Sequence, residues 1–131
     1  MSPIAKVLIV DDNEHVRRRL RRILSLFGCE FFEAETEDEA LALIAEHAFQ
    51  VIFLDIRLPF GATGIDVFRK AKEIRSDLGN VVILTGWLED ATRSEAVALG
   101  AYAWLDKAPL DRNDILEVFQ RAVAEQGGDA Q

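Results

Sequence analysis

The feature that most constrains the fold of this chain is a regular alternation between short apolar runs and longer amphipathic segments. Three runs are continuously apolar, at Val7–Val10, Val51–Leu54 and Val81–Leu84, and weaker runs lie at Glu30–Ala34 and Tyr102–Leu105. Uninterrupted apolar runs of this length are typical of parallel strands that are buried on both faces of a sheet. We therefore expect an α/β fold with five parallel strands.

The segments between and after these runs carry apolar residues at helical spacing, which predicts a helix after each strand. In the first segment, one face carries the arginines and the other carries Val16, Leu20, Ile23, Leu24 and Phe27. The second segment opens with Thr36-Glu37-Asp38-Glu39, a capping box that satisfies free N–H groups at a helix start. The other predicted helices include Val67–Ala71, Glu89–Leu99 and Ile115–Ala122. Five strand–helix repeats predict a (βα)5 sheet with helices on both faces.

Length and charge limit the classes of protein to which the chain can belong. With 131 residues, half of them hydrophobic, it has the length of one domain, which we assign to residues 1–126, followed by a short polar tail at 127–131. The net charge of −8 argues against direct nucleic-acid binding, because phosphate backbones favour basic surfaces. The sequence shows no secretory leader and no long apolar span, so we expect a cytoplasmic protein without membrane contact.

Polar residues follow four of the five expected strands, at Asp11-Asp12, Asp55, Thr85-Gly86 and Lys107. The carboxyl ends of parallel strands share one edge of a sheet, and functional sites of such folds lie at that edge. Three carboxylates in one crevice repel each other, and a divalent cation resolves this conflict; oxygen ligands suit Mg²⁺. An ammonium and a hydroxyl beside them suit the transfer of a phosphoryl group to a carboxylate.

Four segments in this order resemble the response-regulator receiver family of two-component signal transduction, which includes chemotaxis-regulator-like proteins. They are Leu8–Asn13, Leu54–Pro59, Ile83–Gly86 and Gly100–Lys107, and the resemblance runs from Lys6 to Ala124. It implies a flavodoxin-like doubly wound sheet with strand order 2-1-3-4-5. It also implies a phosphoacceptor that signals through protein–protein contacts. The reactions it would catalyse are its own Mg²⁺-dependent phosphorylation and dephosphorylation.

The resemblance also implies a role for each matched residue. Asp55 would be the phosphoacceptor and a metal ligand, and Lys107 would pair with it and then with the phosphoryl oxygen. Asp12 would bind Mg²⁺ directly, Asp11 through water or by orienting the ion, and the backbone carbonyl of Arg57 would be a further ligand.

Two residues are expected to transmit phosphorylation to the surface. By the same resemblance, Thr85 would move toward the phosphoryl group and the aromatic ring of Trp104 would follow it inward. A sensor histidine kinase or a histidine phosphotransfer protein would supply the phosphoryl group. A downstream protein would receive the signal, and homodimerisation stays open.

Three departures from the family pattern qualify this prediction. Lys107 is followed by Ala108, and the proline comes one place later, so we expect a trans Lys107–Ala108 bond. The loop from Pro59 to Gly64 is one residue longer than usual. The switch residue is tryptophan where tyrosine or phenylalanine is commoner.

Two hypotheses concern residues around the site. Arg57 and Trp87 each lie two positions beyond a site residue, so we hypothesise that they limit access of water to a phosphoaspartate. The arginines of the first helix form either a solvated face or a docking patch for an acidic partner; they are Arg17, Arg18, Arg19, Arg21 and Arg22.

Other functions stay open at this point. The chain could be a receiver-like adaptor that works without phosphorylation, or an N-terminal fragment of a larger response regulator. A metal-dependent phosphatase would need a second carboxylate where this chain has Arg57. A flavin carrier would need a phosphate-binding loop where it has Asp11-Asp12-Asn13.

Overall fold

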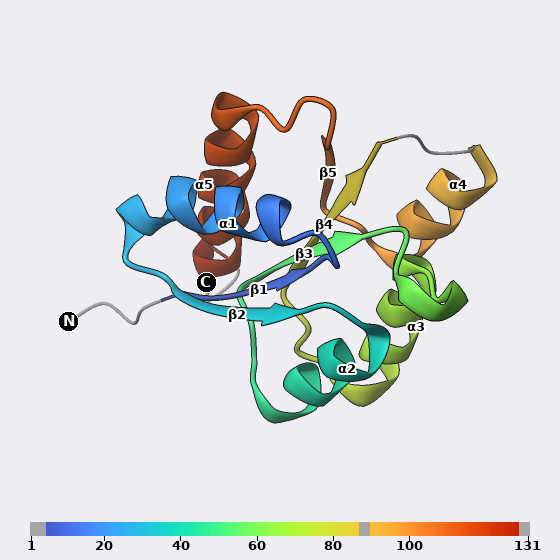
Figure 1. Cartoon of the computed structure of the whole chain (residues 1–131). Helices are drawn as coiled ribbons and strands as arrows, with labels where there is room; N and C mark the ends of the chain where they lie inside the picture. The colour runs from blue at the N-terminus through green and yellow to red at the C-terminus, as the bar shows by residue number, and fades with distance from the viewer. Residues whose placement is uncertain (1–4, 87–89, 129–131) are drawn as a thin grey trace.

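Five parallel strands form one sheet in the order β2-β1-β3-β4-β5, which confirms the predicted topology (Figure 1). The structure is a computed structural model and describes residues 5–86 and 90–128. The strands are β1 (Lys6–Val10), β2 (Glu30–Ala34), β3 (Val51–Asp55), β4 (Asn80–Thr85) and β5 (Ala103–Asp106). The helices are α1 (Glu14–Leu24), α2 (Glu37–Glu46), α3 (Gly64–Ile74), α4 (Asp90–Leu99) and α5 (Arg112–Gly128).

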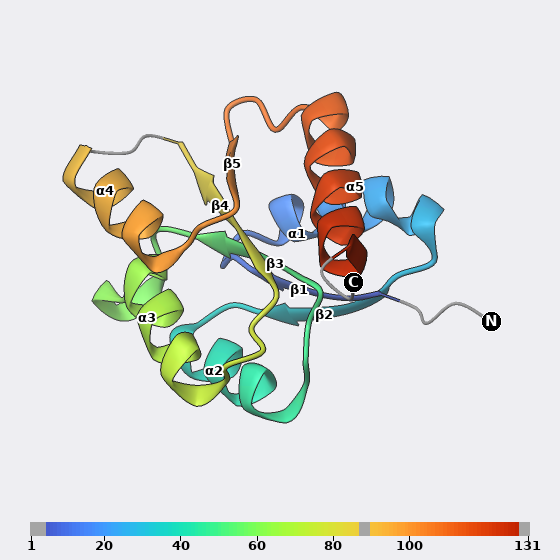
Figure 2. The ribbon, with the colours of Figure 1, turned by 180° about the vertical axis from the view of Figure 1, so that it is seen from behind.

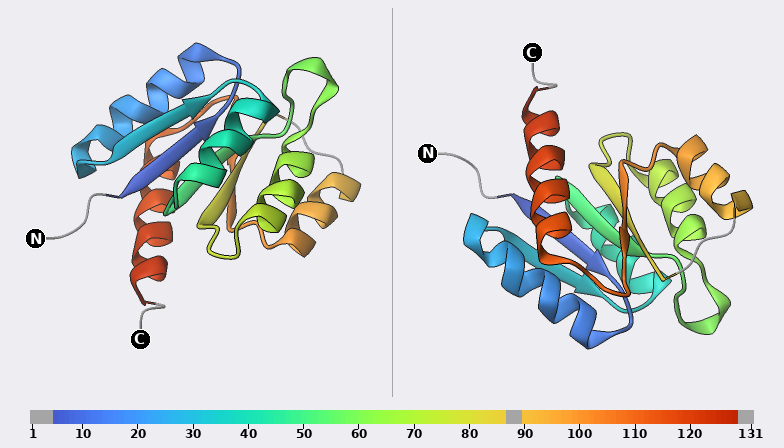
Figure 3. Two further views of the ribbon diagram at one scale, coloured as in Figure 1. Left: turned by 90° about the horizontal axis from the view of Figure 1, so that it is seen from below. Right: turned by 90° about the horizontal axis from the view of Figure 1, so that it is seen from above.

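Helices cover both faces of the sheet, as the continuously apolar strands predict. The side chains of α1 and α5 pack on one face, against inward residues such as Val7, Phe53 and Leu84. The helices α2, α3 and α4 pack on the other face, against residues such as Leu8 and Ile83. Figure 2 shows these layers from behind. In Figure 3, the left view, from below, has α2, α3 and α4 in front of the sheet, and the right view, from above, has α1 and α5 in front of it.

Element boundaries differ from the sequence-based expectations at a few positions. Phe27, predicted on the buried face of the first helix, instead lies in a 3₁₀ turn after α1 and is 39% exposed, because the α-helix ends at Leu24. Helix α5 continues to Gly128, so it includes two residues that we assigned to the tail.

Two local predictions concern helix capping and loop geometry. Thr36 Oγ1 accepts a hydrogen bond from Glu39 N at 3.2 Å, as a capping box requires, and the Glu39 carboxylate accepts from Glu35 N, one residue before the cap. The Lys107–Ala108 bond is trans, as expected, and the cis bond among the described residues is Ala108–Pro109. None of the described helices is long and apolar enough to cross a membrane.

Candidate functional site

The carboxyl ends of β1, β3, β4 and β5 meet at one edge of the sheet, where an open cavity has a volume of about 460 Å³. Five of the predicted site residues line it: Asp12, Asp55, Arg57, Thr85 and Lys107. Oxygen atoms from the carboxylates of Asp11, Asp12 and Asp55 lie within 4.8 Å of one another. The fold thus brings together residues that are separated by up to 96 positions in the sequence.

The turn after β1 holds two of these carboxylates in different environments. Asp11 is fully buried, and its Oδ1 accepts a hydrogen bond from Asn13 N at 2.9 Å. Asn13 in turn caps α1, because its side-chain oxygen accepts from His15 N at 2.8 Å. Asp12 is exposed on the cavity side. This turn therefore places one carboxylate inside the protein and the next one within reach of solvent and ligands.

Lys107 joins the two buried carboxylates. Its Nζ lies 2.8 Å from Asp11 Oδ2 and 3.2 Å from Asp55 Oδ2. The lysine backbone is held in place because its N–H donates to Thr85 O at 3.0 Å. Burial opposes the charge of the ammonium, but the hydrogen bond to Asp11 and the charge of Asp55 outweigh burial and raise the pKa of Lys107. The ammonium therefore stays charged at neutral pH.

The pKa of Asp55 is raised despite the contact with this lysine. Burial, followed by the charge of Asp11, raises the pKa of Asp55 from 3.8 to about 6, while Lys107 and the N–H of Arg57 act in the opposite direction. The Arg57 N–H donates to Asp55 Oδ1 at 3.3 Å. The side chain is only 7% exposed. A further positive charge beside Asp55 would therefore favour its ionised form.

The loop after β3 is held close to Asp55 by a glycine. A Cβ atom on Gly64 would lie 2.3 Å from the backbone oxygen of Asp55, so no other residue fits here without a shift of the backbone. The Gly64 N–H donates to Ile56 O at 2.7 Å, which joins the start of α3 to the end of β3. At the outer end of this loop, Phe60 has a φ of 63° and is 93% exposed. The sequence around Gly64 carries no local signal for this close contact.

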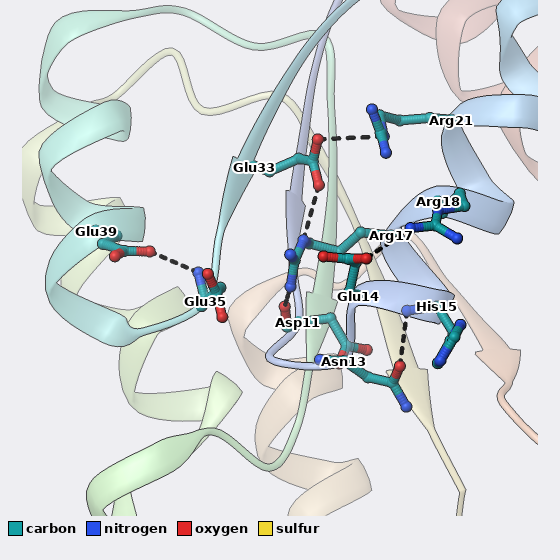
Figure 4. Close-up of polar contacts among 10 residues, drawn as sticks. All are labelled: Asp11, Asn13, Glu14, His15, Arg17, Arg18, Arg21, Glu33, Glu35 and Glu39. Atoms are coloured by element: carbon teal, nitrogen blue, oxygen red, sulfur yellow. Dashed lines mark hydrogen bonds and ion pairs between the residues drawn. The ribbon is translucent and has the colours of Figure 1, made fainter.

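An arginine of α1 contacts the backbone of the site from behind, an arrangement that the helical pattern alone does not predict (Figure 4). Arg17 is only 8% exposed, so its assignment to the solvated or docking face of the helix was wrong. Its Nη1 donates to the backbone oxygen of Asp11 at 2.8 Å, and its Nε donates to Glu33 Oε1 at 2.7 Å. Arg21 Nε lies 3.1 Å from the other oxygen of Glu33. This cluster connects α1 and β2 to the turn that carries the acidic pair.

The predicted switch residues lie in two different places. Thr85 lines the cavity, whereas Trp104 is a half-buried residue of β5 that does not line it. The guanidinium carbon of Arg93, on α4, lies 4.8 Å from the centre of the Trp104 ring, in a cation–π contact. Trp87, for which we hypothesised a role in water access, lies outside the described residues.

Comparison with known proteins identifies the family. Residues 7–120 match the family model of the response regulator receiver domain. The chain belongs to this family. It is 38% identical over 109 residues to the photosynthetic apparatus regulatory protein RegA of Rhodovulum sulfidophilum, covering 83% of this chain and 58% of RegA. Receiver domains are the phosphoacceptor domains of two-component response regulators, to which the chain is therefore homologous.

Solved structures of receiver domains and response regulators have the same fold as this chain. A CheY-like receiver domain protein from Methanospirillum hungatei superposes with a TM-score of 0.89 at 28% identity, covering 97% of this chain and 99% of that one. A response regulator protein from Burkholderia pseudomallei, with a phosphorylated aspartic acid, a calcium ion and citrate, superposes with a TM-score of 0.78 at 29% identity, over 96% of this chain and 72% of that one.

Several relatives are much longer than this chain. It spans 26% of the regulatory protein AtoC of Escherichia coli, in addition to the 58% of RegA given above. The similarity to these relatives therefore concerns their receiver portions.

Proposed function

We propose that Asp55 accepts a phosphoryl group from the phosphohistidine of a sensor histidine kinase or a histidine phosphotransfer protein. The observation that carries the proposal is the joint placement of Asp55, Lys107 and two further carboxylates at one open cavity. The burial of Asp55 and the contact with Lys107 distinguish it from the solvated carboxylates that end many strands.

The charges at the site fit one divalent cation. Three carboxylates face a single ammonium there, which leaves a formal charge of −2. Burial and then the charge of Asp11 raise the pKa of Asp55, and Lys107 lowers this pKa without cancelling the rise. All side-chain donors are oxygens, which Mg²⁺ prefers. We assign Asp11, Asp12, Asp55 and the backbone carbonyl of Arg57 to the Mg²⁺ site.

The residues of the chain have distinct tasks in the transfer. An Asp55 carboxylate oxygen attacks the phosphorus atom, an O–P bond forms, and the N–P bond to the donor histidine breaks. When bound, Mg²⁺ supplies positive charge that neutralises the phosphoryl oxygens. Lys107 is already within reach of Asp55 and supplies a second positive charge, and Thr85 donates its hydroxyl to a phosphoryl oxygen. Hydrolysis of the acyl phosphate by water restores the carboxylate.

The Burkholderia structure supports this assignment, since that related protein carries a phosphorylated aspartic acid and a calcium ion. From membership of the receiver family, we further propose that Thr85 and Trp104 form the switch that changes the surface presented to a downstream protein. We place the protein in the cytoplasm and expect neither direct nucleic-acid binding nor membrane binding. We expect no catalysis beyond its own phosphorylation and dephosphorylation, and homodimerisation is left open.

The proposal is tested by the rate of phosphorylation with acetyl phosphate and Mg²⁺, followed by phosphate-affinity gel electrophoresis. Lys107→Ala is expected to lower the rate by about 100-fold or more, because it removes a positive charge from the transferring group. Asp12→Asn is expected to raise the Mg²⁺ concentration needed for half-maximal rate. The matched control is Lys70→Ala, which removes an exposed lysine that pairs with Glu37 on another surface. Wild-type rates in Lys107→Ala and Asp12→Asn would contradict the assignment.

A further inference from the structure

A second recess lies between α1 and α5, away from the cavity at Asp55. Its volume is about 370 Å³, and it is lined by His15, Arg18, Arg19, Arg22, Ile23 and Arg112. The first five residues belong to α1, and Arg112 is the first residue of α5. Figure 3 shows these two helices on the same face of the sheet. Four guanidinium groups thus surround one small recess in a chain whose net charge is −8.

The positive charge of this recess is only partly compensated. Arg18 Nη2 donates to Glu14 Oε2 at 2.6 Å, whereas Arg19 Nε donates to the backbone oxygen of Leu110 at 2.8 Å, which fixes the side chain without neutralising it. Within residues 5–86 and 90–128, no ion pair engages Arg22 or Arg112. Four cations therefore face one paired carboxylate.

The other acidic groups near the start of α5 form no ion pair with these arginines among the described residues. Asp111 and Asp114 are exposed, and the Asp111 carboxylate accepts a hydrogen bond from Asp114 N at 3.0 Å, so that it caps its own helix. Elsewhere on α1, Arg17 and Arg21 share Glu33. The uncompensated charge of α1 is thus concentrated at the recess.

The chemistry of the recess suits a compact anion with several charges. Guanidinium groups bind phosphate oxygens through paired hydrogen bonds, and arginine rather than lysine lines the recess. Its volume of about 370 Å³ falls within the range of small-molecule sites. The side chain of Ile23 is buried and gives the recess an apolar wall.

We propose that the recess between α1 and α5 binds a small anion with two linked phosphate groups, supplied as inorganic pyrophosphate or as a nucleoside diphosphate. The site shares no lining residue with the Asp55 cavity. The hydrogen bond from Arg19 to Leu110 joins the recess to the loop after β5, three residues beyond Lys107.

The test is isothermal titration calorimetry of the full chain at constant ionic strength and without Mg²⁺, so that the anion is not held by a metal at Asp55. The probes are pyrophosphate, ADP and a glutamate-rich peptide. Pyrophosphate is expected to bind with a stoichiometry of one, and the double variant Arg22→Gln/Arg112→Gln is expected to weaken binding at least tenfold. Tighter binding of ADP would indicate a nucleotide as the ligand, and equal or weaker binding of ADP would indicate inorganic diphosphate.

Two controls locate the bound anion. Arg121→Gln removes one positive charge from an exposed position of α5 outside the recess and is expected to leave the affinity unchanged. Lys107→Ala removes the ammonium of the Asp55 cavity and is also expected to leave it unchanged. Circular dichroism verifies that each variant is folded. The proposal is overturned if pyrophosphate does not bind, if the double variant binds as well as the wild type, if binding is lost in Lys107→Ala, or if only the peptide binds.

Discussion

Replacing Asp55 with asparagine is expected to stabilise the metal-free protein at neutral pH. The wild-type carboxylate is buried beside Asp11, and this environment raises its pKa from 3.8 to about 6. The folded state therefore binds the Asp55 proton more tightly than the unfolded state does. An asparagine at this position carries no charge and avoids the cost of a buried carboxylate.

The size and sign of the effect follow from this pKa. A difference of about 2 pKa units between the folded and unfolded states corresponds to about 3 kcal/mol. As pH rises from about 4 to about 6, the wild type loses this free energy of unfolding because its folded state must release the proton. Above pH 6 the loss is complete. This pKa already includes the attraction of Lys107, so after allowance for screening by solvent we expect Asp55→Asn to be more stable than the wild type by about 1–3 kcal/mol at pH 7.5.

The assay is urea denaturation in EDTA at a series of pH values between 4 and 8, followed by circular dichroism. The difference in unfolding free energy between Asp55→Asn and the wild type is expected to grow with pH up to about 6 and then stay constant. The matched control is Glu73→Gln, which removes one negative charge from an exposed position of α3. It is expected to show a difference of about 0.5 kcal/mol or less at every pH.

Two results would refute this reasoning. If Asp55→Asn were less stable than the wild type at pH 7.5, the ion pair with Lys107 would outweigh burial and the repulsion from Asp11. If the difference in unfolding free energy between the two proteins did not depend on pH, the pKa of Asp55 would not be raised in the folded state. Addition of Mg²⁺ is expected to stabilise the wild type more than Asp55→Asn, because the ion then has the third carboxylate available.

Three further changes probe the surroundings of the site. Gly64→Ala is expected to cost about 2 kcal/mol or more of unfolding free energy and to slow phosphorylation, because its Cβ would lie 2.3 Å from Asp55 O; a wild-type denaturation midpoint would contradict the close contact. Arg17→Ala is expected to lower the unfolding free energy by about 2 kcal/mol or more, because the Asp11 carbonyl and the Glu33 carboxylate lose this partner. Arg18→Ala, at an exposed position of the same helix, is expected to lower it by about 0.5 kcal/mol or less. Phe60→Gly is expected to raise the unfolding free energy by about 0.5 kcal/mol, because glycine adopts a φ of 63° without strain; a clear loss of stability would show that the exposed ring has a packing role.

The sequence predicts the fold and the main site residues because both depend on strong local signals. Continuous apolar runs place β1, β3 and β4 in the centre of the sheet, and the polar residue that ends each run falls at the shared edge. The capping box at Thr36 and the apolar stripe of α1 up to Leu24 likewise follow from short-range spacing.

What the sequence does not predict depends on contacts between distant residues. Arg17 looks like one more solvated arginine of α1, and only its position opposite Glu33 on β2 makes it a buried support of Asp11. The need for glycine at position 64 arises from the approach of α3 to Asp55, and the basic recess requires Arg112 of α5 beside α1. Each of these depends on how the helices pack on the sheet, which helical periodicity does not specify.

The central claim, that Asp55 is the phosphoacceptor, is tested most directly by intact-protein mass spectrometry after incubation with acetyl phosphate and Mg²⁺, followed by peptide mapping. The account predicts one phosphoryl group per chain, on the peptide that contains Asp55, and no adduct in Asp55→Asn or when Mg²⁺ is removed with EDTA. An unmodified wild-type chain, or an adduct that persists in Asp55→Asn, would contradict it.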